Sequence, residues 1–471
     1  MSQANAIVYF KRDLRIQDHA PLCNALSHPN VLPIYIFEPS VWGYPDMSYK
    51  HYSFVWESLQ DLNCYLAQLG LRLKVEVGEA IDVFEKIYKQ FRYSNVYSHE
   101  ETGNGITYKR DIALNRWFSS QGIAWKESPS NGVIRRLKSR DHWAQLRDKR
   151  MEQDLLRPSR HLPPVEPLPL PNIPLLTQLE TFQGQKGGST EGHRLLDDFL
   201  QRRLDHYPKS LSSPLTGEWG CSRLSPHLSF GTLSMREIVK KAQGYRNGFA
   251  LKSFSSRLYW RCHFIQKLEQ QPEIEFEAMH PGLDDLKRLN DPNHPHYKAW
   301  TEGLTGYPYV DACMRFLKTK GWINFRARAL LVSFATYDLH LDWRLIAHFL
   351  ARQFIDYEPG IHYSQLQMQS GVTGINVPRM YDPIKQSMDH DPDGTFIRTW
   401  VPELDVPAPE IHTPWNLPSL FCPKIPNYPS PIVEHKTQIK KARAMLSAAY
   451  KTKDFDSLAK EVYKKLGSRK S

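Results

Sequence analysis

The chain has 471 residues, enough for two domains with full cores, and its hydrophobic fraction of 41% and charged fraction of 24% are typical of an ordinary soluble protein. No apolar run approaches the roughly 18 residues of a membrane helix, and the N-terminus passes directly into a strand pattern. We therefore expect neither a membrane span nor a signal peptide, and we predict a cytoplasmic protein. The net charge of +11 permits a polyanionic partner such as nucleic acid but does not prove one.

Short apolar runs with strand character alternate with helical stretches through the first part of the chain. They cover residues 6–10, 31–37, 71–77, 95–99 and 123–127. Such alternation predicts an α/β domain over residues 1–130, with a doubly wound parallel five-stranded sheet that is covered on both faces. Sheets of this kind bind ligands at the C-terminal ends of their strands. The chain has no GxGxxG motif, so we do not expect an ordinary dinucleotide site.

Residues 131–190 form the predicted connector between two domains. The stretch from 157 to 176 is rich in Pro and the stretch from 184 to 193 is rich in Gly. A Pro-rich segment is stiff and extended, so we expect this half of the connector to lie along the surface.

From residue 191 to residue 471 the patterns are helical, which predicts an all-α second domain. The segment 304–358 indicates two or three consecutive helices, because apolar residues recur there at three- and four-residue spacing. Arg326, Arg328, Asp356 and Glu358 are charged residues within this apolar segment. Either they form ion pairs with each other, or they hold a polar molecule in a pocket.

Six cysteines occur far apart along the chain, without a CxxC pair: Cys23, Cys64, Cys221, Cys262, Cys313 and Cys422. This usage suits a reducing compartment and argues against a zinc or iron–sulfur site, so we expect no metal. The basic stretches near the C-terminus are typical of a solvated helix.

Several segments together resemble one family. They are KRDLRIQDHAPL near the N-terminus, CSRLSPHLSFGTLSMRE, TGYPYVDACMR, GWINFRAR, DLHLDWR and FIRTWVPEL. In sequence and in order they are similar to motifs of the cryptochrome/photolyase family, and they cover nearly the whole chain. The resemblance implies that the helical domain binds FAD and that the chemistry is light-driven electron transfer.

The resemblance also implies which residues hold FAD. The SRLSP loop and a Tyr upstream match the residues that grip the pyrophosphate. The carried-over cofactor-binding residues are Tyr207, Ser222, Arg223, Leu224, Ser225, Arg328, Asp356 and Glu358. On its own, SRLSP is more often a simple capped helix start. A second antenna chromophore stays uncertain. The family's N-terminal domain can hold a folate or a deazaflavin, but Thr107 stands where folate-binding photolyases have a Glu, so we do not expect folate.

The residues that match the family's lesion-facing positions depart from its pattern. Trp260 matches the Trp that contacts damaged pyrimidines, while Arg257 stands at the position of a catalytic Glu. Arg257 can donate to a pyrimidine carbonyl or bind a phosphate, but it cannot take over the carboxyl's protonation role. Phe325 stands where photolyases commonly have Asn or His. Met368 stands where a second Trp would stack on the lesion.

His362 aligns with the residue that faces flavin N5 in the family. An unperturbed histidine is half charged near pH 6.5, so its charge would tune the flavin radical. The alternative is a loop histidine without a role.

No Trp occurs between Trp343 and Trp400, so the flavin-proximal ring of the family's tryptophan chain is missing. Leu366 takes its place. Trp343 matches the bridging ring and Trp300 matches the surface ring. Tyr363 is the nearest substitute for the missing ring by sequence, although a loop Tyr more often only packs.

The preferred hypothesis is a blue-light-driven DNA photolyase that splits UV-induced pyrimidine dimers with an electron from reduced FAD. Arg326 and Arg379 match residues that contact DNA phosphate, and either could instead be a surface arginine. We expect UV-damaged DNA as the partner and a monomeric protein. The first alternative is a cryptochrome-like light sensor without repair activity, and the second is a nucleic-acid-binding protein in which the flavin is structural.

Overall fold

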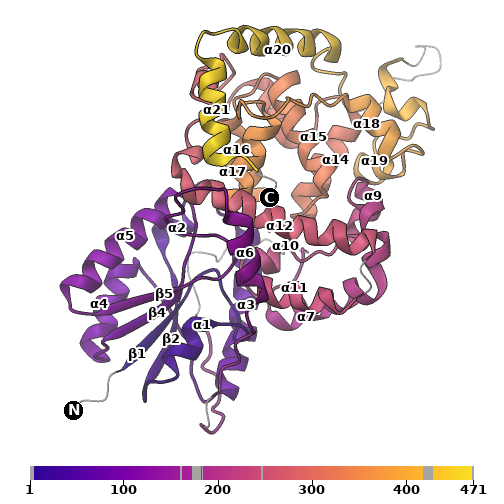
Figure 1. The fold of residues 1–471 in the computed structure, drawn as a ribbon. Helices are drawn as coiled ribbons and strands as arrows, with labels where there is room; N and C mark the ends of the chain where they lie inside the picture. The colour runs from indigo at the N-terminus through magenta and orange to yellow at the C-terminus, as the bar shows by residue number, and fades with distance from the viewer. Residues whose placement is uncertain are drawn as a thin grey trace.

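The computed structural model describes residues 5–159, 162–171, 182, 184–245, 248–416 and 428–468. The first part of the chain forms a sheet domain and the rest forms a helical domain beside it (Figure 1). Within the described ranges, no helix is both long enough and apolar enough to cross a membrane.

The strands are β1 Ala6–Phe10, β2 Val31–Phe37, β3 Lys74–Val77, β4 Asn95–His99 and β5 Ala124–Ser128. The helices of the first part are α1 Ala20–Ala25, α2 Pro39–Trp42, α3 Tyr49–Gln68, α4 Ala80–Gln90, α5 Gly105–Ser120 and α6 Trp143–Glu152. The helices of the second part are α7 Ser189–Asp198, α8 Tyr207–Ser210, α9 Pro214–Gly220, α10 Ser225–Ser229, α11 Met235–Gln243, α12 Phe249–Gln270, α13 Pro295–Glu302, α14 Pro308–Lys320, α15 Phe325–Ser333, α16 Trp343–Gln353, α17 Pro359–Gln369, α18 Pro383–His390, α19 Thr395–Trp400, α20 His435–Tyr450 and α21 Phe455–Leu466.

The sheet is entirely parallel, with the strand order β3-β2-β1-β4-β5. Alternate residues of β1 enter different cores. Ala6, Val8 and Phe10 pack on the side of α1 and α3, whereas Ile7 and Tyr9 pack on the side of α4 and α5. A central strand that is buried on both faces is apolar throughout, which is why it has no polar alternation. The predicted doubly wound sheet is confirmed.

The C-terminal end of β1 is held against the helical domain. Arg12 Nε donates to the carbonyl of Ser229 at 2.9 Å, and the Leu14 amide donates to the carbonyl of Phe230 at 3.1 Å. Gly231 follows with a φ of 64°, and a Cβ there would lie 2.3 Å from the Arg12 carbonyl oxygen. Only glycine fits so close an approach. The C-terminal edge of the sheet therefore contacts the end of α10, the short helix that begins within the SRLSP segment.

The segment 304–358 forms α14, α15 and α16, as predicted. Gly321 ends α14 in the left-handed conformation, and the Asp342 carboxylate caps α16 by accepting from the Arg344 amide at 2.8 Å. The segment that follows forms a further helix, α17, over residues 359–369. Pro359 occupies the first turn of α17, where its fixed φ favours a helix and its missing N–H costs nothing.

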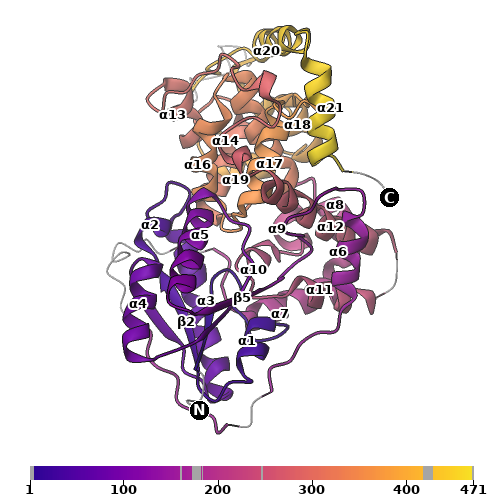
Figure 2. The same ribbon diagram turned by 60° about the vertical axis from the view of Figure 1, so that its left-hand side comes forward.

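The connector is extended where the structure describes it. Residues 162–171 have no regular structure, and they lie along α3, since the Val165 amide donates to the Ala67 carbonyl at 3.0 Å and Asn63 donates to the Leu168 carbonyl at 2.6 Å. Figure 2 shows the chain after α6 running along the outside of the molecule. Residues 172–181 of the predicted connector lie outside the described residues. The division of the chain at residues 130 and 190 stays a prediction.

Candidate functional site

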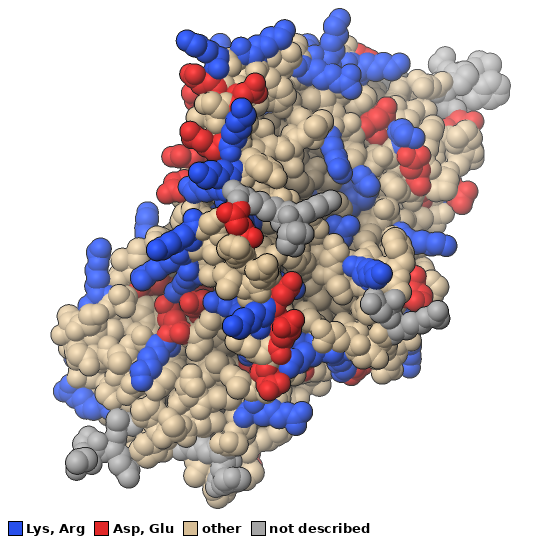
Figure 3. Space-filling model, in the orientation of Figure 1, with Lys and Arg blue, Asp and Glu red and all other residues tan. Residues whose placement is uncertain are grey.

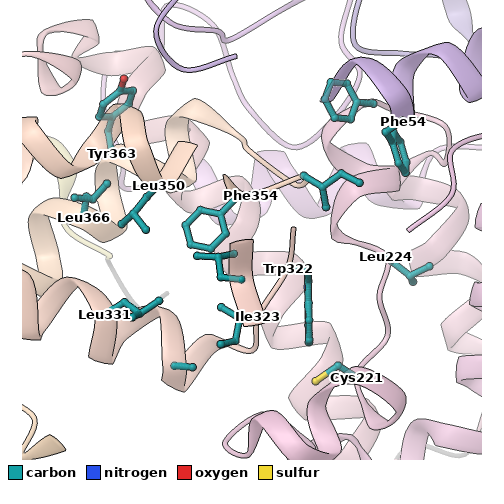
Figure 4. Close-up of a cluster of buried hydrophobic side chains, with 14 of the residues drawn as sticks. Phe54, Cys221, Leu224, Trp322, Ile323, Leu331, Leu350, Phe354, Tyr363 and Leu366 are labelled. Carbon is teal, nitrogen blue, oxygen red and sulfur yellow. The ribbon is translucent and has the colours of Figure 1, made fainter. Parts of the chain in front are cut away.

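A cavity of about 310 Å³ lies inside the helical domain. Its walls come from the SRLSP loop and from α12, α15, α16 and α17. It brings together every predicted cofactor-binding residue and every predicted catalytic residue: Tyr207, Ser222, Arg223, Leu224, Ser225, Arg257, Trp260, Arg328, Asp356, Glu358 and His362. Much of the rest of the wall is apolar, with Leu366 and Leu350 on one side and Trp322, Leu224 and Cys221 on the other (Figure 4).

Arg223 is the cation of the SRLSP loop. Its φ of 61° is unusual for a residue with a side chain, and such strain is typical of functional sites. The guanidinium lies 4.0 Å from the centre of the Trp322 ring, and its Nη1 is buried without a hydrogen-bond partner among the described residues. Burial lowers the pKa of Arg223 to about 10. A buried guanidinium with an unused donor attracts an anion, which fits the pyrophosphate of FAD.

Arg328 and Asp356 form a bidentate ion pair at the cavity wall. Arg328 Nη1 and Nη2 donate to the two Asp356 oxygens at 3.1 and 2.9 Å. Arg328 Nε donates to the Ile323 carbonyl at 2.8 Å, and the guanidinium covers the Phe354 ring at 4.2 Å. These contacts hold both charged groups in a fixed plane beside the cavity, so they fit the polar edge of an isoalloxazine ring.

Glu358 is paired with Arg261, which the sequence analysis missed. Arg261 Nη2 lies 2.5 Å from Glu358 Oε2 and also donates to the Leu228 carbonyl at 2.9 Å. Arg261 lines the cavity on α12, four residues after Arg257, so the two arginines share one helical face. That spacing was visible in the sequence.

His362 lies on α17 and faces the cavity, in contrast to the alternative of a loop position. Its Nε2 lies 2.9 Å from the Ala347 carbonyl, which can only accept, so Nε2 carries the proton. Burial lowers the pKa of His362 to about 3. The expectation that this residue is half charged near pH 6.5 is therefore wrong, and His362 presents a neutral imidazole to the cavity.

The helical phase of α17 also corrects the place of Met368. Gln365, Leu366 and Gln369 line the cavity together with His362, whereas Met368 does not. Residues three and four positions apart share one face of a helix, and Met368 lies off that face. The expectation that Met368 faces a lesion is wrong, and the amides of Gln365 and Gln369 take that side of the cavity.

The rim of the cavity is aromatic and cationic. Arg257 is exposed on α12, and its guanidinium lies 5.6 Å from the ring centre of Phe325 on α15, which is also exposed. Trp260 stacks on Phe264 with ring centres 5.7 Å apart. The two departures at Arg257 and Phe325 therefore contact each other across the rim.

Arg326 and Arg379 lie outside the cavity wall. Arg326 is half-buried, with its guanidinium 5.4 Å from the Tyr381 ring, and its Nε has no partner among the described residues. Arg379 is exposed, and its carbonyl accepts from the Ser333 hydroxyl at 3.3 Å. Figure 3 shows Lys and Arg side chains around a hollow on one face of the helical domain.

The predicted electron-transfer residues do not line the cavity. Trp343 is buried on α16. Trp300 is also completely buried and donates from Nε1 to the Leu331 carbonyl at 3.2 Å, so its expected surface position is wrong. Tyr363 is buried with its hydroxyl pointing away from Phe354 (Figure 4).

Ion pairs lie at the C-terminal edge of the sheet, where an antenna chromophore would be expected. Lys11 lies 3.2 Å from Asp111, and Arg110 lies 2.8 Å from Glu38 and 2.6 Å from Glu101. A cavity of about 70 Å³ lies beside them, and another of about 340 Å³ lies near the ends of β4 and β5, lined by Glu101, Trp125 and Glu127. The expectation that folate is absent stays a prediction.

One cluster in the described ranges has the composition of a metal site: Asp13, His19 and His99. Asp13 Oδ2 accepts from His19 Nε2 at 2.9 Å and from His99 Nδ1 at 2.8 Å. His19 Nδ1 accepts from the Leu22 amide at 3.1 Å, so both of its ring nitrogens are already occupied. We interpret the cluster as a hydrogen-bonded brace. Cys422 lies outside the described residues, and the other cysteines are free thiols.

Comparison with known proteins agrees with this geometry. A model of the DNA photolyase domain matches residues 6–139, and a model of the FAD binding domain of DNA photolyase matches residues 254–448. The chain is 29% identical over 462 residues to a deoxyribodipyrimidine photo-lyase of Streptomyces griseus, covering 93% of this chain and 99% of the relative. It is 27% identical over 489 residues to a cryptochrome DASH of Gloeobacter violaceus, covering 96% and 97%.

The structure of an archaeal photolyase from Sulfolobus tokodaii with two FAD molecules superposes with a TM-score of 0.78 and 29% identity, covering 94% of this chain and all of the other. The matched domains include the whole sheet and most of the cavity wall. The chain belongs to the cryptochrome/photolyase family of flavoproteins, and FAD is its cofactor.

Proposed function

We propose that this protein is a DNA photolyase, a lyase that splits UV-induced pyrimidine dimers under blue light. Reduced FAD, when bound, supplies the electron that opens the dimer and regains it afterwards. The relatives named deoxyribodipyrimidine photo-lyase support this activity. The observation that carries the proposal is one cavity that joins buried charged groups at its wall to aromatic side chains that include the half-buried Trp260.

The protein's own part is to bind and orient. Arg223 would hold the pyrophosphate, and the pair of Arg328 and Asp356 would fix the flavin ring edge. Trp260 would stack on an extruded pyrimidine, because a dimer must leave the duplex to reach a buried cofactor. The apolar wall excludes water from the electron path.

Arg326 and Arg379 would contact the phosphates on either side of the lesion. Such contacts position the duplex without reading its sequence, which suits recognition of damage. In this proposal the protein acts on UV-damaged DNA as a monomer.

A photorepair assay tests this function. The reduced holoprotein is irradiated with DNA that carries either cyclobutane dimers or (6-4) products, and intact pyrimidines are counted against a dark control. Restoration of one lesion type in light only is the expected result. No restoration of either lesion by a protein with full FAD occupancy would contradict the proposal.

The second candidate is a light sensor without repair activity. The contact between Arg257 and Phe325 favours it, because Arg257 replaces a carboxylate and its cation lies over an apolar ring at the rim. A sensor would photoreduce its FAD normally and leave both lesions intact. The same assay therefore separates the two candidates.

A further inference from the structure

Tyr357 lines the flavin cavity between the cofactor anchors Asp356 and Glu358, and it also lines the small cavity at the sheet edge. The residue is buried, and its ring centre lies 5.2 Å from the ring of His362. His51 of α3 lies on another side at 6.0 Å. Tyr357 is thus an oxidisable ring at the wall of the flavin cavity that the sequence analysis did not name.

The hydroxyl of Tyr357 contacts a carboxylate of the other domain. It donates to Asp46 Oδ2 at 2.6 Å, and Asn104 Nδ2 donates to the same oxygen at 2.7 Å. Asp46 Oδ1 is buried without a hydrogen-bond partner among the described residues. Burial raises the pKa of Asp46, which increases its affinity for a proton. The tyrosine therefore has a proton acceptor already in contact.

We propose that Tyr357 is the electron donor when light reduces oxidised FAD in this protein, with Asp46 as the acceptor of its phenolic proton. The inference rests on FAD in the cavity and is independent of DNA repair, since photoreduction needs no DNA.

The step balances as a one-electron, one-proton transfer. Tyr357 gives one electron to photoexcited FAD, and its O–H bond breaks as the proton moves to Asp46 Oδ2. A neutral tyrosyl radical and a protonated carboxyl remain. An external thiolate then gives one electron to the radical and becomes a thiyl radical, while Asp46 returns the proton to the Tyr357 oxygen. Without the thiolate, the electron returns from the flavin to the tyrosyl radical, and no reduced FAD accumulates.

Two of the rings that the sequence analysis named for electron transfer are less suited to this step. Tyr363 does not line the cavity, and its hydroxyl lies beside that of Tyr357 rather than against a carboxylate. A proton released by Tyr363 would therefore reach Asp46 only through Tyr357. Trp343 is buried on α16 and does not line the cavity. Tyr357 combines access to the cofactor with a base.

The test compares single variants of the FAD-loaded full chain without DNA. Tyr357→Phe removes the phenolic proton and keeps the ring, and Asp46→Asn removes the base and keeps its shape. Tyr337→Phe is the control, because Tyr337 is buried like Tyr357 but does not line the cavity, and its hydroxyl has no hydrogen-bond partner among the described residues. FAD occupancy verifies folding. Photoreduction with a thiol is followed by absorption, and the radical by electron paramagnetic resonance.

The parent protein and Tyr337→Phe should form a tyrosyl radical and photoreduce more slowly in heavy water. Tyr357→Phe should lose the radical. Tyr357→Phe and Asp46→Asn should each photoreduce about 10²-fold more slowly, the lower end of what a positioned proton acceptor contributes. Parental kinetics and radical in Tyr357→Phe would overturn the proposal, as would loss of the radical in Tyr363→Phe alone. A parent protein that photoreduces its FAD in this way but repairs neither lesion in the photorepair assay would instead contradict the proposed photolyase function.

Discussion

Replacing Asp356 by alanine tests how the cavity holds its cofactor. The substitution removes both acceptors of the bidentate pair at 2.9 and 3.1 Å and leaves the Arg328 charge uncompensated beside an apolar wall. Arg328 keeps its bond to the Ile323 carbonyl, so the guanidinium stays near its place without its partner.

The magnitude follows from burial. Removing one partner of a fully buried ion pair costs about 3–5 kcal/mol. The Asp356 side chain is 5% exposed but that of Arg328 is 27% exposed, so solvent screens part of the loss. We expect a loss of about 2 kcal/mol in FAD binding, which corresponds to about 30-fold weaker affinity.

The assay is equilibrium titration of FAD into flavin-free protein, with thermal unfolding measured in parallel. Glu403→Ala is the matched control, since Arg315 also holds Glu403 through two bonds, at 3.0 and 2.7 Å, and neither residue lines the cavity. The control should lose some stability and bind FAD as the parent does. Full FAD affinity in Asp356→Ala would refute the assignment of this pair to the cofactor.

Three further outcomes are expected. Arg326→Ala and Arg379→Ala should each weaken lesion-containing and intact duplex about equally and reduce the slope of log affinity against log salt by about 0.9, and an affinity independent of salt would contradict this. His362 is neutral when folded and protonates more readily when unfolded, so its contribution to stability is complete above about pH 6.5 and is lost as pH falls toward 3. Between pH 6.5 and pH 5, the free energy of unfolding should fall by about 2 kcal/mol more in the parent than in His362→Asn. The spectrum of the flavin radical in the parent should stay constant from pH 5 to about pH 8. Leu366→Trp should speed photoreduction if Trp343 can relay the electron, and adding Trp343→Phe should cancel that gain. Transient absorption measures both rates. Slower photoreduction after Trp343→Phe alone would contradict the inference that the tryptophan chain is interrupted at Leu366.

Much of this architecture follows from local pattern. The apolar runs of β1 and β2 predicted a doubly covered sheet, because both faces of those strands are buried. The cavity residues were carried over from motifs, and Arg223, Arg328 and Asp356 do meet in one place.

What the sequence did not predict depends on helical phase and on contacts between domains. Matching to the family placed Met368 toward the lesion, whereas the helical phase of α17 puts Gln365, Leu366 and Gln369 on the cavity face together with His362. Burial of Trp300 depends on the packing of helices that are distant in sequence. The contact of Tyr357 with Asp46 joins residues 311 positions apart, which no local pattern encodes.

The most direct test of repair is a single-flash experiment on the fully reduced protein bound to dimer-containing DNA. If the electron returns after splitting, each productive flash creates intact pyrimidines and the absorption of reduced FAD recovers without added reductant. The same flash with undamaged DNA should leave the DNA unchanged. Lasting oxidation of the flavin without any restored pyrimidine, or identical transients with damaged and undamaged DNA, would contradict the assignment as a photolyase.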